Sequence, residues 1–204
     1  MPTKPKLAES DFYNASIRLD VPVAVVKAFA EVESRGDGFL PTGVPVVLFE
    51  RHVMYKRIKE KFGFTRADAL VKQYPDIINP KSGGYGKVSE QPGRMERAAN
   101  LIDRTCALES ASWGLFQLMG YHWKRLGYDS LQSFINHMYA SESDQLEGFV
   151  RFVLTDQALH KALRAKNWAV VAALYNGPAY DAAPGRANDY DTKLADAFAR
   201  HSTA

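Results

Sequence analysis

Apolar residues recur with helical spacing along most of the chain. Val26, Phe29 and Ala30 stand at positions i, i+3 and i+4, which predicts a helix over residues 21–35 with Asp20 as its N-cap. Similar patterns predict further helices over residues 50–62, 94–110, 112–127, 130–142, 143–165, 167–176 and 190–201. Many helices joined by short connections are typical of a mainly α single domain.

Two stretches interrupt this helical pattern. Residues 38–49, GFLPTGVPVVLF, begin with turn-forming residues and end in an apolar, β-branched run, which predicts a short strand or extended segment. Residues 74–93, YPDIINPKSGGYGKVSEQPG, are rich in glycine and proline. A loop of this length inside a compact domain is often functional. We therefore expect at most a small β element.

One acidic residue, Glu33, falls on an apolar stripe. It lies seven positions after Val26, where the helical pattern requires a core residue. A carboxylate that leaves water must be paired, become neutral or line a cleft. The other interpretation is that Glu33 lies at a frayed helix end, because Gly36 and Gly38 follow it closely. Position alone leaves both interpretations open.

The composition is that of a folded globular protein, with 46% hydrophobic and 24% charged residues and a mean hydropathy of −0.29. The net charge of +3 makes the chain mildly basic, but Lys and Arg are scattered. A nucleic-acid partner is therefore not expected. No apolar run approaches the roughly 18 residues of a transmembrane helix, so no membrane span is expected.

Cysteine and histidine usage narrows the chemistry further. The single cysteine, Cys106, excludes an intrachain disulfide and lies on an apolar helix stripe, where a small core residue is expected. The five histidines lack metal-binding spacing, so neither a metal nor a cofactor is expected. The N-terminal sequence has no apolar segment typical of a signal peptide, which predicts synthesis in the cytoplasm.

Three short motifs follow one another along the chain: EVESRG, SASWGLFQLM and ALYNGPAY. Their order resembles the E-S, S-x-G-L-x-Q and A-Y-N-G motifs of the goose-type lysozyme and soluble lytic transglycosylase branch of the lysozyme superfamily. With PVVLFERH, GGYG and YDTKLADAF added, the chain from about residue 20 resembles the N-acetylmuramidase domain of phage endolysins.

This resemblance implies a lysozyme-like fold in which residues 1–204 form a single catalytic domain with no separate wall-binding domain. It implies a monomer that acts on peptidoglycan glycan strands and hydrolyses the β-1,4 bond from N-acetylmuramic acid to N-acetylglucosamine. It also implies phage origin, so that the enzyme reaches the wall, in the periplasm, after a partner permeabilises the membrane. The alternatives are a lytic transglycosylase and a non-catalytic glycan-binding module.

The resemblance assigns the catalytic acid to Glu33. Apolar surroundings raise a carboxyl pKa, which keeps such an acid protonated near neutral pH. Glu50 lies 17 positions later and is the candidate second carboxylate, although it could equally only begin the next helix. Glu109 is a third candidate, for which an ion-paired structural role is as plausible.

Neutral polar residues of the motifs suit sugar hydroxyl and N-acetyl groups. By the resemblance, Ser112 and Gln117 line the cleft, and Tyr175 and Asn176 lie near the acid. We expect the Tyr175 hydroxyl to orient Glu33, whereas Asn176 could instead serve only as a helix C-cap.

Two further residues complete the predicted site. Tyr85 is expected to stack on a sugar ring, with residues 79–93 bordering the groove. His52 is expected beside the cleft, the alternative being a structural hydrogen bond.

Overall fold

The computed structural model describes residues 4–33, 37–176 and 189–203. The α-helices are α1 (Glu9–Leu19), α2 (Val23–Glu33), α3 (Arg51–Phe62), α4 (Phe64–Gln73), α5 (Gln91–Leu101), α6 (Arg104–Glu109), α7 (Leu131–Ala140), α8 (Glu142–Leu154), α9 (Gln157–Arg164), α10 (Trp168–Asn176) and α11 (Tyr190–Ser202). The strands are β1 (Val47–Phe49), β2 (Ala111–Trp113) and β3 (Leu118–Met119), and the 3-10 helices are η1 (Val88–Glu90) and η2 (Gly120–His122). A mainly α fold with a small β element is thereby confirmed.

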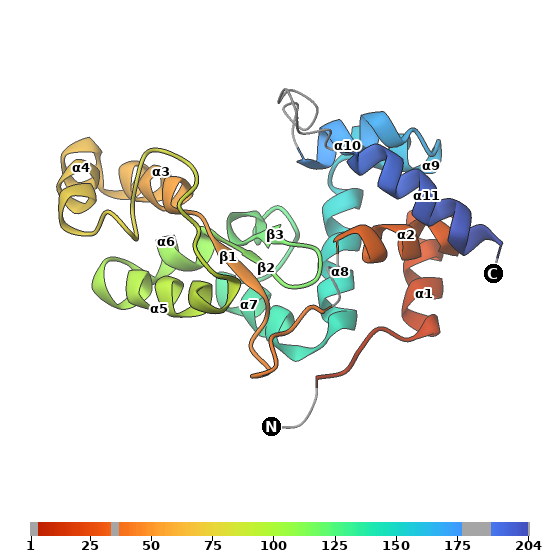
Figure 1. Ribbon diagram of the computed structural model, residues 1–204, viewed down its shortest axis with the longest axis horizontal. Coiled ribbons are helices and arrows are strands. Elements are labelled where there is room, and N and C mark those ends of the chain that lie inside the picture. The colour runs from red at the N-terminus through yellow and green to blue at the C-terminus, as the bar shows by residue number, and fades with distance from the viewer. Residues whose placement is uncertain (1–3, 34–36, 177–188, 204) are drawn as a thin grey trace.

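The elements fall into three groups along the long axis of the molecule (Figure 1). Helices α1, α2 and α9–α11 lie at one end, and α3–α6 lie at the other. The small sheet, α7 and α8 lie between them. Buried residues from all three groups pack into one hydrophobic core, so burial of apolar surface holds both ends together.

The sheet is antiparallel, in the order β1-β2-β3. Val47 pairs with Trp113, and Trp113 pairs with Leu118; all three are buried in the core. Side chains alternate between the two faces of a strand, so Ser112 and its partners Leu48 and Met119 share the opposite face. Glu50 follows β1 two positions after Leu48, so it continues this second face.

The prediction of a helix over residues 112–127 is wrong. This segment forms the β2–β3 hairpin and then η2. Gly114 and Gln117 have φ angles of +68° and +46°, which a right-handed helix excludes. The Gly114 N–H donates instead to the Val46 carbonyl, 2.7 Å away, which extends the pairing of the sheet.

Two other predicted helices are each divided in two by a capping aspartate. Asp103 accepts a hydrogen bond from the Cys106 N–H and begins α6, so residues 94–110 are not one helix. Asp156 accepts from the Leu159 N–H and begins α9, which divides residues 143–165. Asp20 does not cap α2 as predicted; it is the left-handed C-cap of α1.

Cys106 is buried, as its place on an apolar stripe predicts. Burial, followed by a hydrogen bond to Asp103, raises the pKa of its thiol to about 12. A thiol so far from ionisation is suited to the core. Within the described ranges, no helix is both long and apolar enough to cross a membrane.

Candidate functional site

Glu33 is the last residue of α2 and is partly withdrawn from water. The same helix buries Val26, Phe29 and Ala30 in the core, so its apolar stripe carries the carboxyl group inward. Burial raises the pKa of Glu33 from 4.5 to about 7. A hydrogen bond donated by the Tyr190 hydroxyl to Glu33 Oε1 opposes this shift. Glu33 does stand at the end of its helix, as the frayed-end interpretation has it, and its carboxyl group is held there by the Tyr190 hydroxyl.

The hydrogen bond expected from Tyr175 to Glu33 comes from Tyr190 instead. The Tyr175 hydroxyl donates to the Phe116 carbonyl, 2.9 Å away, in the β2–β3 turn. Its ring stacks on that of Tyr190, with centroids 6.3 Å apart and an interplanar angle of 10°. Tyr175 is thus a spacer that places Tyr190 against the acid, and it joins the Glu33 region to the sheet.

Tyr190 is a site residue that the sequence analysis missed. It begins α11, and it starts an apolar stripe that continues with Leu194 and Ala197, both buried. A tyrosine in such a stripe buries its ring and needs a hydrogen-bond partner for its hydroxyl. That requirement was the available sequence signal, but it does not identify which residue the hydroxyl meets.

Glu50 follows β1 directly, and its backbone N–H donates to the Ser110 carbonyl, 2.8 Å away. It is the N-cap residue of α3, as the alternative interpretation predicted, but its side chain makes no capping hydrogen bond. Glu50 Oε2 is buried 3.2 Å from His52 Nδ1, without hydrogen-bond geometry. The carboxylate is therefore available for a role other than capping.

Tyr85 lies beside Glu50 and is half-buried. Burial, and then the charge of Glu50 and a hydrogen bond to it, raise the pKa of the Tyr85 phenol. The predicted loop thus carries its aromatic residue to the second carboxylate. Stacking of Tyr85 on a sugar ring stays a prediction.

Three side chains hold the loop that carries Tyr85. Arg51 donates to the Gly83 and Pro75 carbonyls, at 2.6 Å and 3.0 Å, and Arg94 donates to the Gly84 carbonyl at 3.0 Å. Gly84 has a φ of +69°, and a Cβ at this position would collide with the Arg51 guanidinium. Gly84 therefore permits a close approach of the loop backbone to Arg51.

Gln91 is the third of these side chains, and sequence reasoning missed it. It has 0% exposure, accepts from the Phe49 N–H at 3.3 Å and donates to the Tyr85 and Lys87 carbonyls. One amide thus connects the end of β1, next to Glu50, to the backbone of Tyr85. Glutamine is seldom fully buried, so this role could not be predicted from the residue type.

Ser112 and Gln117 meet across the β2–β3 hairpin. The Ser112 hydroxyl donates to Gln117 Oε1, and Gln117 Nε2 donates to the Gly114 carbonyl, each at 2.8 Å. Gln117 is half-buried and keeps a positive φ, a strained conformation that is typical of functional positions. These two hydrogen bonds hold the Ser112 and Gln117 side chains in place across the turn.

The remaining candidates have clear places. Glu109 accepts from Trp123 Nε1 at 3.0 Å and pairs with Arg57 Nε at 3.3 Å, so its role is structural. The side chain of Asn176 lies outside the described residues, as do residues 34–36. Among the residues that the structure describes, no group of three or more His, Cys, Asp or Glu side chains could hold a metal ion.

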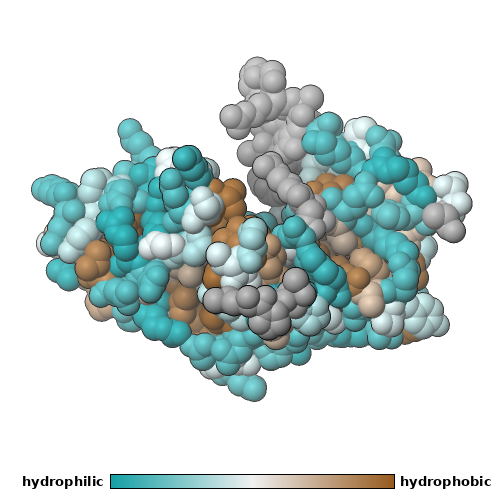
Figure 2. Space-filling view, turned by 60° about the horizontal axis from the view of Figure 1, so that its bottom comes forward, coloured by the Kyte–Doolittle hydropathy of each residue, from teal (hydrophilic) through white to brown (hydrophobic). Residues whose placement is uncertain are grey.

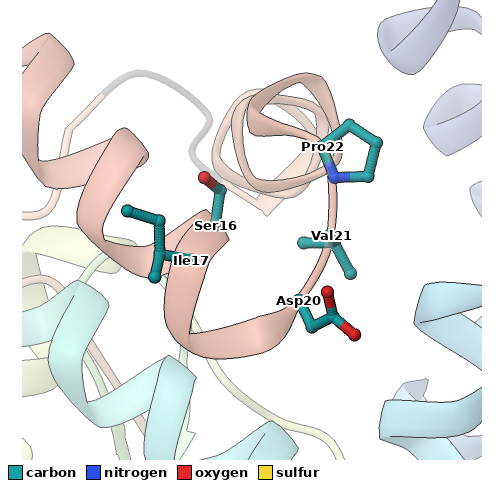
Figure 3. Close-up of a pocket in the computed structure, with 5 residues that line it drawn as sticks. All are labelled: Ser16, Ile17, Asp20, Val21 and Pro22. Carbon is teal, nitrogen blue, oxygen red and sulfur yellow. The ribbon is translucent and has the colours of Figure 1, made fainter.

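Apolar side chains reach the surface near the middle of the face shown in Figure 2. A hollow of about 460 Å³ lies at the turn between α1 and α2. Its lining residues, drawn in Figure 3, are Ser16, Ile17, Asp20, Val21 and Pro22. It includes none of the predicted site residues, and the carboxylate of Asp20 pairs with Arg164. This hollow therefore lies outside the candidate site.

Replacing Gln91 by Met keeps the side-chain volume but removes the amide. The Phe49 N–H and the Tyr85 carbonyl would then lose a buried partner, which costs roughly 1–3 kcal/mol per unsatisfied group. We expect a lower free energy of unfolding by chemical denaturation and a higher KM, because Tyr85 is displaced. Gln73→Met, at an exposed position, is the control and should change neither. Unchanged stability in Gln91→Met would show that this residue does not hold the loop.

Comparison with known proteins agrees with this geometry. The N-acetylmuramidase family matches residues 22–202, which include every predicted site residue. The crystal structure of Burkholderia AP3 phage endolysin is similar, with a TM-score of 0.89 and 46% sequence identity; the match covers 100% of this chain and 74% of that one. No protein of curated function matches significantly. The chain therefore belongs to the N-acetylmuramidase family.

Proposed function

We propose that this glycoside hydrolase is a phage endolysin that hydrolyses the β-1,4 bond from N-acetylmuramic acid to N-acetylglucosamine, with Glu33 as general acid and Glu50 as general base. The observation that carries the proposal is the pKa of Glu33, raised by burial to about 7. A carboxyl with this pKa is protonated in a large fraction of molecules near neutral pH, as a general acid requires.

In the proposed reaction, Glu33 donates its proton to the glycosidic oxygen as the bond between that oxygen and C1 of N-acetylmuramic acid breaks. Water forms a new bond to the same carbon, and a proton of that water passes to the Glu50 carboxylate. The products are a free 4-hydroxyl on N-acetylglucosamine and a reducing end on N-acetylmuramic acid. Afterwards Glu50 releases a proton to solvent and Glu33 takes one up.

The surroundings of the two carboxyl groups suit these different roles. Among the described residues, Glu33 accepts a hydrogen bond from a phenol and has a raised pKa, which suits an acid. Glu50 lies on a different element, at the end of β1, with its Oε2 atom 3.2 Å from His52 Nδ1 and with Tyr85 nearby. The proposal therefore pairs an acid of raised pKa with a second carboxyl group, as glycoside hydrolysis requires.

The hairpin between these carboxyl groups supplies neutral polar groups for the substrate. Ser112 and Gln117 face the side of the sheet that leads to Glu50, and uncharged donors and acceptors suit sugar hydroxyl and N-acetyl groups. The shared core supports the further proposal that the described residues act as one catalytic unit on peptidoglycan.

Product analysis on purified peptidoglycan tests the proposal. Mass spectrometry should find fragments that end in reducing N-acetylmuramic acid. Fragments with 1,6-anhydro ends would assign the chain to the lytic transglycosylases, in which the muramic 6-hydroxyl attacks instead of water. Binding to the wall without release of fragments would remove the catalytic assignment.

Glu33→Gln keeps the side-chain size and removes the transferable proton. General acid catalysis contributes about 10²–10⁴-fold, so turnover on peptidoglycan should fall by at least that order. Glu31→Gln on the same helix is the control and should keep its activity, because Glu31 forms an exterior ion pair with Arg200.

The same variant has an expected effect on stability. A raised pKa in the folded state means that the carboxyl stabilises the wild type fully only below about pH 4.5 and that this contribution is lost as pH rises to about 7. The unfolding free energy of Glu33→Gln, relative to that of the wild type, should therefore increase between about pH 4.5 and about pH 7 and stay constant above pH 7.

Glu50→Gln tests the second carboxylate. If Glu50 is the base for water, this variant should lose activity nearly as severely as Glu33→Gln, and a small nucleophile such as azide should restore part of the turnover. Glu109→Gln is the matched control: its amide oxygen can still accept from Trp123, but the ion pair with Arg57 is lost, so it should lose some stability and keep most turnover. Near-normal activity in Glu50→Gln would assign it a helix-start role only.

Tyr190→Phe tests how the pKa of the acid is set. The Tyr190 hydrogen bond lowers the pKa of Glu33, so its removal should raise that pKa further. Activity is lost as Glu33 deprotonates, and the alkaline limb of kcat/KM against pH should therefore move to higher pH. Tyr175→Phe removes a hydroxyl that donates to the Phe116 carbonyl and should leave the limb in place. A limb unmoved in Tyr190→Phe would contradict this role.

A further inference from the structure

The turn between α3 and α4 exposes two phenylalanine side chains that are two positions apart in the sequence. Phe62 ends α3 with 49% of its surface exposed, and Phe64 begins α4 with 62% exposed. Gly63 separates them, and a Cβ added there would meet no atom within 4 Å, so solvent surrounds the turn. Exposed large apolar residues at one convex place are uncommon unless they meet a partner.

Basic residues surround this pair, which we call the Phe62–Phe64 tip. Lys61 Nζ lies over the Phe62 ring at 5.1 Å, and Lys59 Nζ lies over the Phe64 ring at 4.7 Å. Each lysine thus holds its ammonium group over the face of an exposed aromatic ring. Exposed apolar rings with cations beside them are typical of segments that lie at a membrane–water interface.

The charge of the whole hairpin is unlike that of the rest of the chain. Residues 51–73, which form α3 and α4, hold seven Lys and Arg residues and two acidic ones, a net charge of +5. The chain as a whole carries +3, so the remaining residues together carry −2. Within the described part of the chain, Lys56, Lys59, Arg66 and Lys72 form no ion pair. Arg57 and Lys61 pair with Glu109 and Asp103 from outside the hairpin, so the positive charge without a partner is that of these four residues.

The place of the hairpin in the fold leaves it free to meet a large surface. Helices α3 and α4 lie at one extreme of the long axis, away from α2 and α11, which carry Glu33 and Tyr190 (Figure 1). A partner at the Phe62–Phe64 tip would not cover those two residues.

We propose that the Phe62–Phe64 tip docks on the surface of a bilayer that contains anionic phospholipids. The two rings enter the headgroup region, and the surrounding lysines and Arg66 bind the lipid phosphates. This contact is peripheral, in keeping with the absence of a membrane-spanning helix among the described residues. It would hold the enzyme at the membrane face of the wall while the cleft stays open to glycan.

A glycan strand is the other surface that exposed rings could meet, but the features of the tip favour lipid. A sugar chain is bound in a groove by rings that offer a flat face, whereas these rings stand on a convex turn with cations over them. An anionic lipid surface would interact with both the apolar rings and the hairpin's net charge of +5, whereas a neutral sugar would interact with the rings alone.

Co-sedimentation of the full chain with vesicles tests the proposal. Vesicles of phosphatidylcholine mixed with phosphatidylglycerol should bind the protein at low ionic strength, and vesicles of phosphatidylcholine alone should not. The double variant Phe62→Ser, Phe64→Ser and the double variant Lys59→Glu, Arg66→Glu should each bind at least tenfold more weakly. Added salt should weaken binding of the wild type, because it screens the charges.

Matched controls separate this contact from general stickiness and from catalysis. Ile17→Ser removes a side chain of similar exposure, 60%, from α1 at the other end and should bind as the wild type does. All variants should keep the wild-type melting temperature and the wild-type rate on purified peptidoglycan, since the tip lies apart from the proposed catalytic residues.

Several outcomes would overturn the proposal. One is a wild type that ignores vesicles with phosphatidylglycerol, and another is undiminished binding by the phenylalanine variant. Equal loss in Ile17→Ser would show that any exposed apolar residue suffices. If the phenylalanine variant lost binding to purified peptidoglycan and not to vesicles, the tip would be a glycan contact instead.

Discussion

The candidate site depends on the withdrawal of one carboxyl group, that of Glu33, from water. Its helix buries an apolar stripe, and the carboxyl at the end of that stripe follows the stripe inward. Burial alone favours the neutral form, and the Tyr190 hydroxyl, which can donate to either form but more strongly to the anion, moderates that preference. The result is a pKa of about 7, from which the group can both hold a proton and give it up.

This arrangement requires α11 to pack on α2. The Tyr190 ring reaches Glu33 from α11, and Tyr175 of α10 supports that ring from behind. Tyr175 in turn donates to Phe116, in the turn that carries Gln117. The acid and the β2–β3 hairpin are therefore connected by two aromatic side chains, which come from the C-terminal helices α10 and α11.

Helices whose apolar residues repeat regularly could be predicted from the sequence. The helices predicted over residues 50–62 and 130–142 correspond closely to α3 and α7, and the helix predicted over residues 21–35 contains α2, because local periodicity determines which face is buried. The predictions fail where the conformation of one or two backbone residues determines the secondary structure. Apolar and polar residues do not alternate regularly over residues 112–127, so the segment resembles a helix. Gly114 and Gln117 nevertheless have positive φ angles, and the chain forms a hairpin there. Strands of two or three residues are too short to show alternation.

The residues of the candidate site also differ in whether local sequence or distant contacts determine their position. Glu33 could be found because its own helix makes it anomalous. Tyr190 lies 157 positions away, and Gln91 is 42 positions from the Phe49 N–H that it binds; no periodicity relates such residues. Tyr85 was predicted to stack on a sugar from its glycine-rich loop, yet its phenol lies close enough to Glu50 for that carboxyl group to raise its pKa, which only the folded loop reveals. Sequence patterns thus identify the residue that is out of place, whereas the residues that make its position useful follow from the tertiary contacts that surround it.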